Sequence, residues 1–180
     1  MLQIESYTSM QENIGTLSLA EQRKKPVSVV DLPGHERLRY KCFDQHKSSG
    51  LAIIYVLDAS TITKGIRDAT EFLFRILSDP LVHRNRTPVL IVCNKQDLTL
   101  AKGATVIERE LAKEVGLIRV THSGFLQSTN GNAAVDHVFL GKEGKDFAFS
   151  DLKAKLDFCE TSALTEENID KITDWISRQA

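Results

Sequence analysis

Residues 89–97 read Val-Leu-Ile-Val-Cys-Asn-Lys-Gln-Asp, an apolar run that ends in four polar residues. The run follows Pro88 and is too short and too rich in β-branched residues for a helix. We therefore predict a strand that is buried on both faces of a parallel sheet. Polar residues at the end of such a strand lie at the carboxyl edge of the sheet, where open α/β sheets bind their ligands. The stretch predicts an α/β fold with a binding site directly after Cys93.

The order Asn94-Lys95-x-Asp97 has a chemical use in purine recognition. The two acceptor oxygens of Asp97 match the paired N1–H and N2–H donors of guanine, a pair that adenine lacks. The Asn94 amide can bridge the base edge and neighbouring loops, and the methylene stem of Lys95 can lie across the purine face. A solvated loop after a strand explains the same residues when the motif is taken alone.

Two further stretches repeat the design of a short strand followed by small or polar residues. In residues 26–35, Pro-Val-Ser-Val-Val-Asp-Leu-Pro-Gly-His, Asp31 is a candidate Mg²⁺ ligand and Gly34 lets backbone N–H groups approach a terminal phosphate. A plain turn has the same composition. In the later Phe-Cys-Glu-Thr-Ser-Ala, the backbone N–H groups of Ser162 and Ala163 can reach a base oxygen.

The three motifs occur in the chain order of Ras-like small GTPases, which this sequence resembles. Residues 31–39 resemble the second switch, residues 94–97 the guanine-specificity loop, and residues 159–163 the last base-contact loop. The full Asp-Leu-Pro-Gly-His-Glu-Arg-Leu-Arg of the first motif and the late segment 140–150 narrow the resemblance to the beta-subunit family of the signal recognition particle receptor, a relative of the Arf and Sar GTPases. The resemblance extends from about Thr8 to the end of the chain.

This resemblance implies a P-loop NTPase-like fold, a mostly parallel sheet flanked by helices, that binds GTP and Mg²⁺. It places Thr8 in the first switch as a Mg²⁺ ligand beside Asp31, with an ordinary loop threonine as the alternative. It places His35 where related GTPases orient the water for hydrolysis. Because the family implies slow or absent hydrolysis, His35 is a candidate catalytic residue, with a structural role near the partner interface as the alternative.

The resemblance also implies a GTP switch in the targeting of ribosome–nascent chain complexes to the endoplasmic reticulum. The γ-phosphate and Mg²⁺ would order the loops around Thr8 and residues 34–39, which would then form the surface for the receptor's alpha subunit. The ribosome or the translocon would be further partners, at the cytosolic face of the membrane. Two alternatives stay open: an interaction module of the same fold that binds no nucleotide, and an Arf- or Sar-like vesicle-trafficking GTPase.

The 180 residues contain no Gly-x-x-x-x-Gly-Lys-Ser/Thr, the loop that cradles the α and β phosphates. We therefore expect a chain truncated at its N-terminus. The resemblance implies that the missing part holds the central first strand and the phosphate loop, with a membrane anchor further upstream. We also expect this chain alone to bind nucleotide poorly. The sheet should then show a gap or a rearranged strand order between the strand at 27–30 and the strand at 51–57.

Length and composition set the remaining bounds. A chain of 180 residues indicates one domain. Lys and Arg number 23 against 24 Asp and Glu, so no charge excess favours nucleic acid as a partner. No apolar run approaches the ~20 residues of a membrane-spanning helix. Cys42, Cys93 and Cys159 lack metal-ligand spacing and are expected to be reduced core residues.

Hydrophobic spacing predicts the other elements. We expect an antiparallel hairpin from residues 14–19 and 26–30, a mobile helix over 36–47 and a buried strand over 51–58. Helices are expected over 66–77, from Ala104 to a stop near Gly116, and over 169–176 with Trp175 in the core. Residues 121–145 are rich in Ser, Gly, Asn and Thr and are expected to form an insertion loop.

Overall fold

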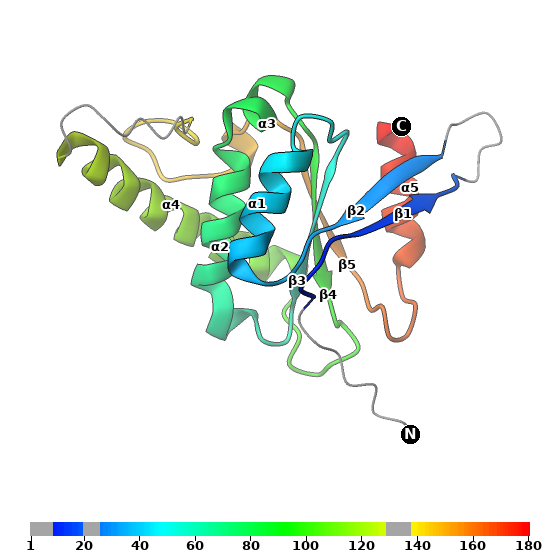
Figure 1. The fold of residues 1–180 in the computed structure, drawn as a ribbon. Helices are drawn as coiled ribbons and strands as arrows, with labels where there is room; N and C mark the ends of the chain where they lie inside the picture. Colours follow the sequence, from blue (N-terminus) through cyan, green and yellow to red (C-terminus); the bar gives the residue numbers. More distant parts are fainter. Residues whose placement is uncertain (1–8, 20–25, 129–137) are drawn as a thin grey trace. The chain divides into compact units, whose positions relative to one another are not determined.

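The computed structural model describes residues 9–19, 26–128 and 138–180. The chain forms two compact units, Met1–Gly50 together with Ala180, and Leu51–Gln179. Each unit has its own β-sheet (Figure 1). None of the helices in the described residues is both long enough and apolar enough to cross a membrane. The assignment of the whole chain to one domain stays a prediction.

The first unit contains a hairpin and one helix. Strand β1 (Asn13–Leu17) pairs antiparallel with β2 (Val27–Asp31), and Asn13 lies opposite Asp31. Helix α1 (Glu36–His46) follows, and its N-cap residue His35 has an extended backbone. The predicted hairpin and the helix after it are therefore confirmed.

The second unit is built on a parallel sheet with the order β3-β4-β5. The strands are β3 (Ile53–Asp58), β4 (Val89–Asn94) and β5 (Leu156–Glu160). Every residue of central β4 from Val89 to Cys93 is buried, as its continuous apolar run predicts. In the described part of the chain β2 and β3 belong to different sheets, which agrees with the expected gap.

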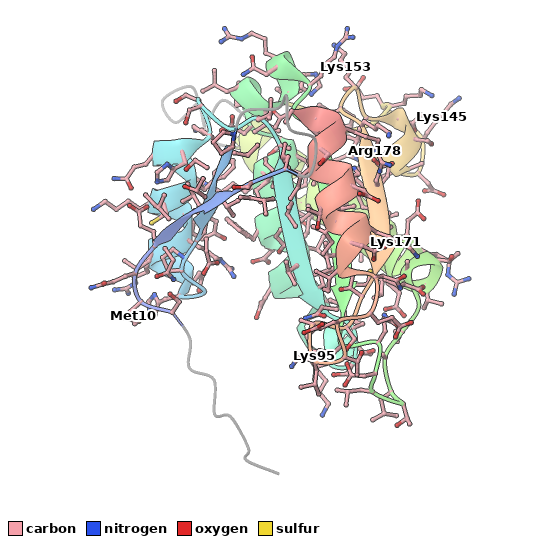
Figure 2. All side chains as sticks on the ribbon, turned by 90° about the vertical axis from the view of Figure 1, so that its right-hand side faces the viewer. Met10, Lys95, Lys145, Lys153, Lys171 and Arg178 are labelled. Carbon is pink, nitrogen blue, oxygen red and sulfur yellow. The ribbon has the colours of Figure 1, made fainter. Side chains whose placement is uncertain are left out.

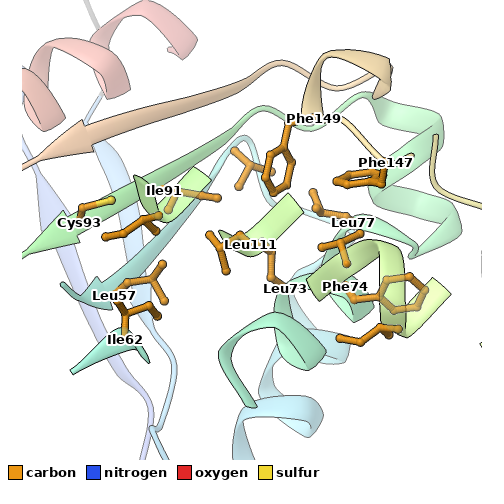
Figure 3. Packing of buried hydrophobic residues seen from close by; sticks show 14 of the residues in the cluster. Leu57, Ile62, Leu73, Phe74, Leu77, Ile91, Cys93, Leu111, Phe147 and Phe149 are labelled. Atoms are coloured by element: carbon orange, nitrogen blue, oxygen red, sulfur yellow. The ribbon is translucent and has the colours of Figure 1, made fainter. Parts of the chain in front are cut away.

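Successive side chains of a strand point to opposite sides of a sheet, so a strand that is apolar throughout needs cover on both faces. Helices provide this cover on both faces of the second sheet. Val89, Ile91 and Cys93 belong to the main core, which includes residues of α2 (Ile62–Leu77) and α4 (Ala104–Ser128) (Figure 3). Leu90 and Val92 pack on the other face against Trp175 of α5 (Ile169–Gln179). The predicted place of Trp175 in the core is confirmed.

Helix α4 does not end near Gly116, as the sequence predicted, but continues to Ser128. A glycine inside a helix costs about 1 kcal/mol relative to alanine. Val115 and Ile118, on either side of Gly116, are buried in the main core, and this burial offsets the cost. A Cβ on Gly116 would lie 3.9 Å from Phe147 Cβ, an ordinary van der Waals distance, so packing leaves room for alanine at this position.

The expected insertion loop at residues 121–145 is only partly irregular. Its first part, to Ser128, is the end of α4. Residues 129–137 lie outside the described residues. Residues 138–145 have no regular secondary structure and lead to a 3-10 helix, η1 (Phe149–Asp151).

A short helix, α3 (Pro80–Asn85), follows α2 and was not predicted. Pro80, which indicates the end of α2, also starts α3, since a proline at the first helical turn loses no helical hydrogen bond. Asp79 caps this helix by accepting hydrogen bonds at Oδ1 from the backbone N–H groups of Leu81 (2.9 Å) and Val82 (3.3 Å).

Candidate functional site

Two loops meet at the carboxyl edge of β4. One follows β4 and contains residues 94–97, and the other follows β5 and contains residues 161–163. Asn94 Oδ1 accepts hydrogen bonds from Ala163 N (3.0 Å) and Thr161 Oγ1 (3.3 Å). Gln96 N donates to Thr161 O at 3.0 Å. These contacts bring together the two sequence motifs that were predicted to form one site.

A direct hydrogen bond also fixes the Asp97 carboxylate. Ser162 Oγ donates to Asp97 Oδ1 at 2.6 Å and accepts from Thr165 N at 3.2 Å. Ser162 is completely buried, whereas Asp97 is exposed. Among the described residues no group binds Asp97 Oδ2. The buried hydroxyl therefore orients the carboxylate and leaves acceptor positions open to a ligand.

The backbone N–H groups that were expected to reach a base oxygen are both engaged. Ala163 N donates to Asn94 Oδ1, and Ser162 N donates to Glu167 O at 3.1 Å. The Asn94 Nδ2 group has no hydrogen-bond partner among the described residues. Asn94 therefore uses its carbonyl oxygen to join the loops and keeps its amide donor available.

Lys95 leaves β4 with a left-handed backbone, φ 68°, and pairs with a residue that the sequence reasoning missed. Its Nζ lies 2.8 Å from Asp58 Oδ2. Asp58 ends β3 and lies opposite Asn94 in the sheet register, so the shared strand end is the signal that could have identified it. Asp58 Oδ1 accepts hydrogen bonds from Ser60 N (2.9 Å) and Ser60 Oγ (2.6 Å).

The charge of Asp58 is strongly favoured in this setting. Partial burial of the carboxyl opposes ionisation, but the hydrogen bonds from Lys95 and Ser60 outweigh it and hold the pKa of Asp58 well below its ordinary value. The carboxylate is thus a constant negative charge at neutral pH. It holds the Lys95 ammonium at the end of β3.

Two further side chains that the sequence reasoning missed anchor these loops to the scaffold. Gln96 Nε2 donates to Cys93 O (3.3 Å) and to Lys102 O (3.0 Å), which closes the loop on itself. Glu160 Oε1 accepts from Ala104 N at 2.6 Å and so satisfies a free N–H at the start of α4. The loop after β4 is therefore tied at both of its ends.

All three cysteines are free thiols. Cys93, directly before Asn94, is fully buried. Burial, with smaller contributions from Glu160 and Cys159, raises the pKa of the Cys93 thiol to about 12. Cys93 is therefore a neutral core residue, as the sequence predicts.

The remaining predicted site residues belong to the first unit or fall outside the description. Asp31 ends β2 and accepts from Asn13 Nδ2 at 3.3 Å. Gly34 and His35 are exposed, and the His35 carbonyl oxygen accepts hydrogen bonds from the N–H groups of Leu38 and Arg39 in α1. Thr8 lies outside the described residues. Their roles toward Mg²⁺, phosphate and water stay predictions.

Comparison with known proteins assigns the family. Residues 2–156 match the family model described as signal recognition particle receptor beta subunit. The chain is 37% identical over 159 residues to the mouse signal recognition particle receptor subunit beta, an alignment that covers 88% of this chain and 59% of the mouse protein. The chain thus spans about three fifths of the length of this relative.

Comparison with solved structures supports the same family. The structure of the mammalian SRP receptor superposes with a TM-score of 0.84 at 34% identity, covering 98% of this chain and 86% of the other. The SRb-GTP/SRX complex from Chaetomium thermophilum gives a TM-score of 0.76 at 19% identity and covers 98% and 81% of the two chains, which shows the shared fold. The chain belongs to the family of signal recognition particle receptor beta subunits.

Proposed function

We propose that the loops at 94–97 and 161–163 bind the guanine base of GTP. The observation that carries this proposal is the hydrogen bond from the buried Ser162 hydroxyl to Asp97, which holds a carboxylate with open acceptor positions at the edge of the sheet. Two parallel N–H donors on one ligand edge match such a carboxylate, and guanine has this pair where adenine does not.

The neighbouring side chains support the same ligand. Asn94 Nδ2 is the donor for the base edge, and the Lys95 stem, held through its ammonium by Asp58, lies across the purine face. The Ala163 N–H reaches the base oxygen by sharing its hydrogen bond with Asn94 Oδ1. Ser162 contributes through its hydroxyl, since its N–H is bonded to Glu167.

We further propose that the chain acts as a GTP switch that binds the alpha subunit of the receptor at the cytosolic face of the endoplasmic reticulum. Family membership supports this proposal, as does the relative from Chaetomium thermophilum, which is a complex of SRb-GTP with SRX. Mg²⁺ neutralises phosphate charge when bound. In this chain Asp31 and Thr8 would hold it, Gly34 would approach the terminal phosphate, and His35 would orient water.

Contacts with the ribosome or the translocon are part of the same proposal and rest on the family resemblance alone. They follow from a role in targeting ribosome–nascent chain complexes. No contact of the described residues argues for either partner separately.

Capture by the alpha subunit tests the switch. The immobilised alpha subunit should retain this chain with GTP and Mg²⁺ present at saturating concentration, and retain less of it with GDP or ATP. Asp97→Asn should lose the response to GTP and regain it with XTP, whose base carries an oxygen in place of the N2 amino group. Equal retention with and without nucleotide would instead favour an interaction module that needs no ligand.

A further inference from the structure

Strand β5 is an edge of the three-stranded sheet, and the described residues contain no strand on its outer side. Val89 N donates to Lys155 O (2.9 Å) and Thr161 N donates to Cys93 O (3.1 Å). In a parallel ladder these bonds alternate along the strand, so the backbone groups of Leu156 and Phe158 face away from β4. They form a row of donors and acceptors that no strand in the described part of the chain pairs with.

The outer edge has a defined length. At its carboxyl end, Asn168 Nδ2 donates to Glu160 O at 3.1 Å and occupies that acceptor. The outward-facing backbone groups that stay open are the N–H and C=O of Leu156 and Phe158. The N–H of Glu160 is the last of them. An edge of this length can pair with a short extended peptide, but it is too short to pair with the edge strand of another sheet.

A groove of about 330 Å³ lies between this edge and α5. Its walls come from β5, including Asp157 and Phe158, and from one face of α5, where Lys171, Trp175 and Arg178 are spaced by about one helical turn. Figure 2 shows Lys171 and Arg178 on the side of α5 that lies beside β5. The groove therefore borders the outer edge of β5 at Phe158, one of the two residues whose backbone groups face away from β4.

The charges of the groove are unequal. Asp157 is already satisfied, because Oδ2 accepts from Trp175 Nε1 (2.7 Å) and lies 3.1 Å from Lys155 Nζ. Lys171 and Arg178 are exposed and have no ion-pair partner among the described residues. Asp174 is the one lining carboxylate in the described chain without such a partner. Two unpaired cations against one carboxylate favour a negatively charged occupant.

We propose that this edge of β5 docks an extended acidic peptide of a partner protein, which adds a strand to the sheet. Main-chain hydrogen bonds to Leu156 and Phe158 would supply the binding, as in other cases of strand addition. Alternate side chains of the peptide would point toward α5, where carboxylates meet Lys171 and Arg178. The peptide side chains between them would lie on the face of the sheet that carries the Phe158 side chain, where apolar residues fit best. This surface is separate from the proposed base-binding loops.

The probe is a fluorescently labelled peptide in which Glu alternates with Val, followed by anisotropy during titration with the 180-residue chain. Saturable binding is expected. Lys171→Glu combined with Arg178→Glu should weaken binding about tenfold, because two favourable charge pairs become repulsive. Lys64→Glu combined with Lys113→Glu changes the net charge equally at exposed sites elsewhere and should leave binding unchanged.

Backbone pairing is tested with two N-methylated forms of the same peptide. Methylation of the N–H groups of one alternating set should abolish binding, and methylation of the other set should preserve it, since only one set faces β5. Trp175, the single tryptophan, reports that each variant is folded. Equal binding of both methylated forms, or full displacement by inorganic polyphosphate without any methylation effect, would show only a general anion-binding patch and overturn the proposal.

Discussion

Asn94→Ala separates the two loops of the site without touching the Asp97 carboxylate. The Asn94 side chain joins the loops through hydrogen bonds from Ala163 N and Thr161 Oγ1, at 3.0 Å and 3.3 Å. Each such bond contributes about 1 kcal/mol, and removal of the acceptor leaves the buried Thr161 hydroxyl without a partner. We expect Asn94→Ala to lower the free energy of unfolding by ~2 kcal/mol.

The assay is urea unfolding followed by the fluorescence of Trp175, which is 2% exposed and reports on the packing of α5 against the sheet. With a urea slope of about 1–3 kcal/mol/M, the midpoint should fall by roughly 1 M. Asn94→Asp keeps an oxygen acceptor and should cost less than half as much. Asn85→Ala, at an exposed position, is the neutral control. If Asn94→Ala costs no more than Asn85→Ala, these hydrogen bonds do not join the loops.

Three further predictions concern acid, alkali and the segment after α4. Because the folded-state pKa of Asp58 lies below its ordinary value of 3.8, its contribution to the free energy of unfolding should be complete above pH 3.8 and should be lost as the pH drops further. In acid unfolding, Asp58→Asn should therefore lose less stability between neutral and acidic pH than the unchanged chain. Because the folded-state pKa of Cys93 is about 12 and its ordinary value is 9.0, stability should decline as pH rises from 9 toward 12, and Cys93→Ala should flatten this decline in alkaline urea titrations. Arg119→Met should release residues 138–145 to fast amide hydrogen exchange, since Arg119 donates to the carbonyl oxygens of Leu140 (3.0 Å), Lys142 (3.3 Å) and Lys145 (2.6 Å); unchanged protection would contradict this role.

Much of the sheet and of the loops proposed to bind the base was predictable because the signals are local. The buried run at 89–93 has the length and the β-branched composition of a central strand, and the residues after such a strand lie at the carboxyl edge. The resemblance to Ras-like GTPases put residues 159–163 in the same site as residues 94–97, and in the structure the neighbouring parallel strands β4 and β5 end side by side and bring Ser162 to Asp97. These predictions needed no knowledge of side-chain packing.

Other features depend on contacts between residues far apart in the chain. Gly116 resembles a helix end in the sequence, and only the burial of Val115 and Ile118 in the core shows why the helix continues through it. Asp58 and Lys95 are 37 positions apart in the sequence, and only the pairing of β3 with β4 shows that they meet. Arg119 binds three backbone carbonyl oxygens that carry no sequence signal, so its role was visible only in the structure.

Guanine selectivity by Asp97 is most directly tested by nuclear magnetic resonance of the ¹⁵N-labelled chain during titration with GMP, XMP and AMP. This method detects the weak binding expected of nucleotides that lack the β and γ phosphates. GMP should shift the amide signals of residues 94–97 and 161–163 in a saturable way, AMP should leave them in place, and Asp97→Asn should transfer the response from GMP to XMP. Equal shifts with GMP and AMP, or an unchanged GMP response in Asp97→Asn, would contradict the account.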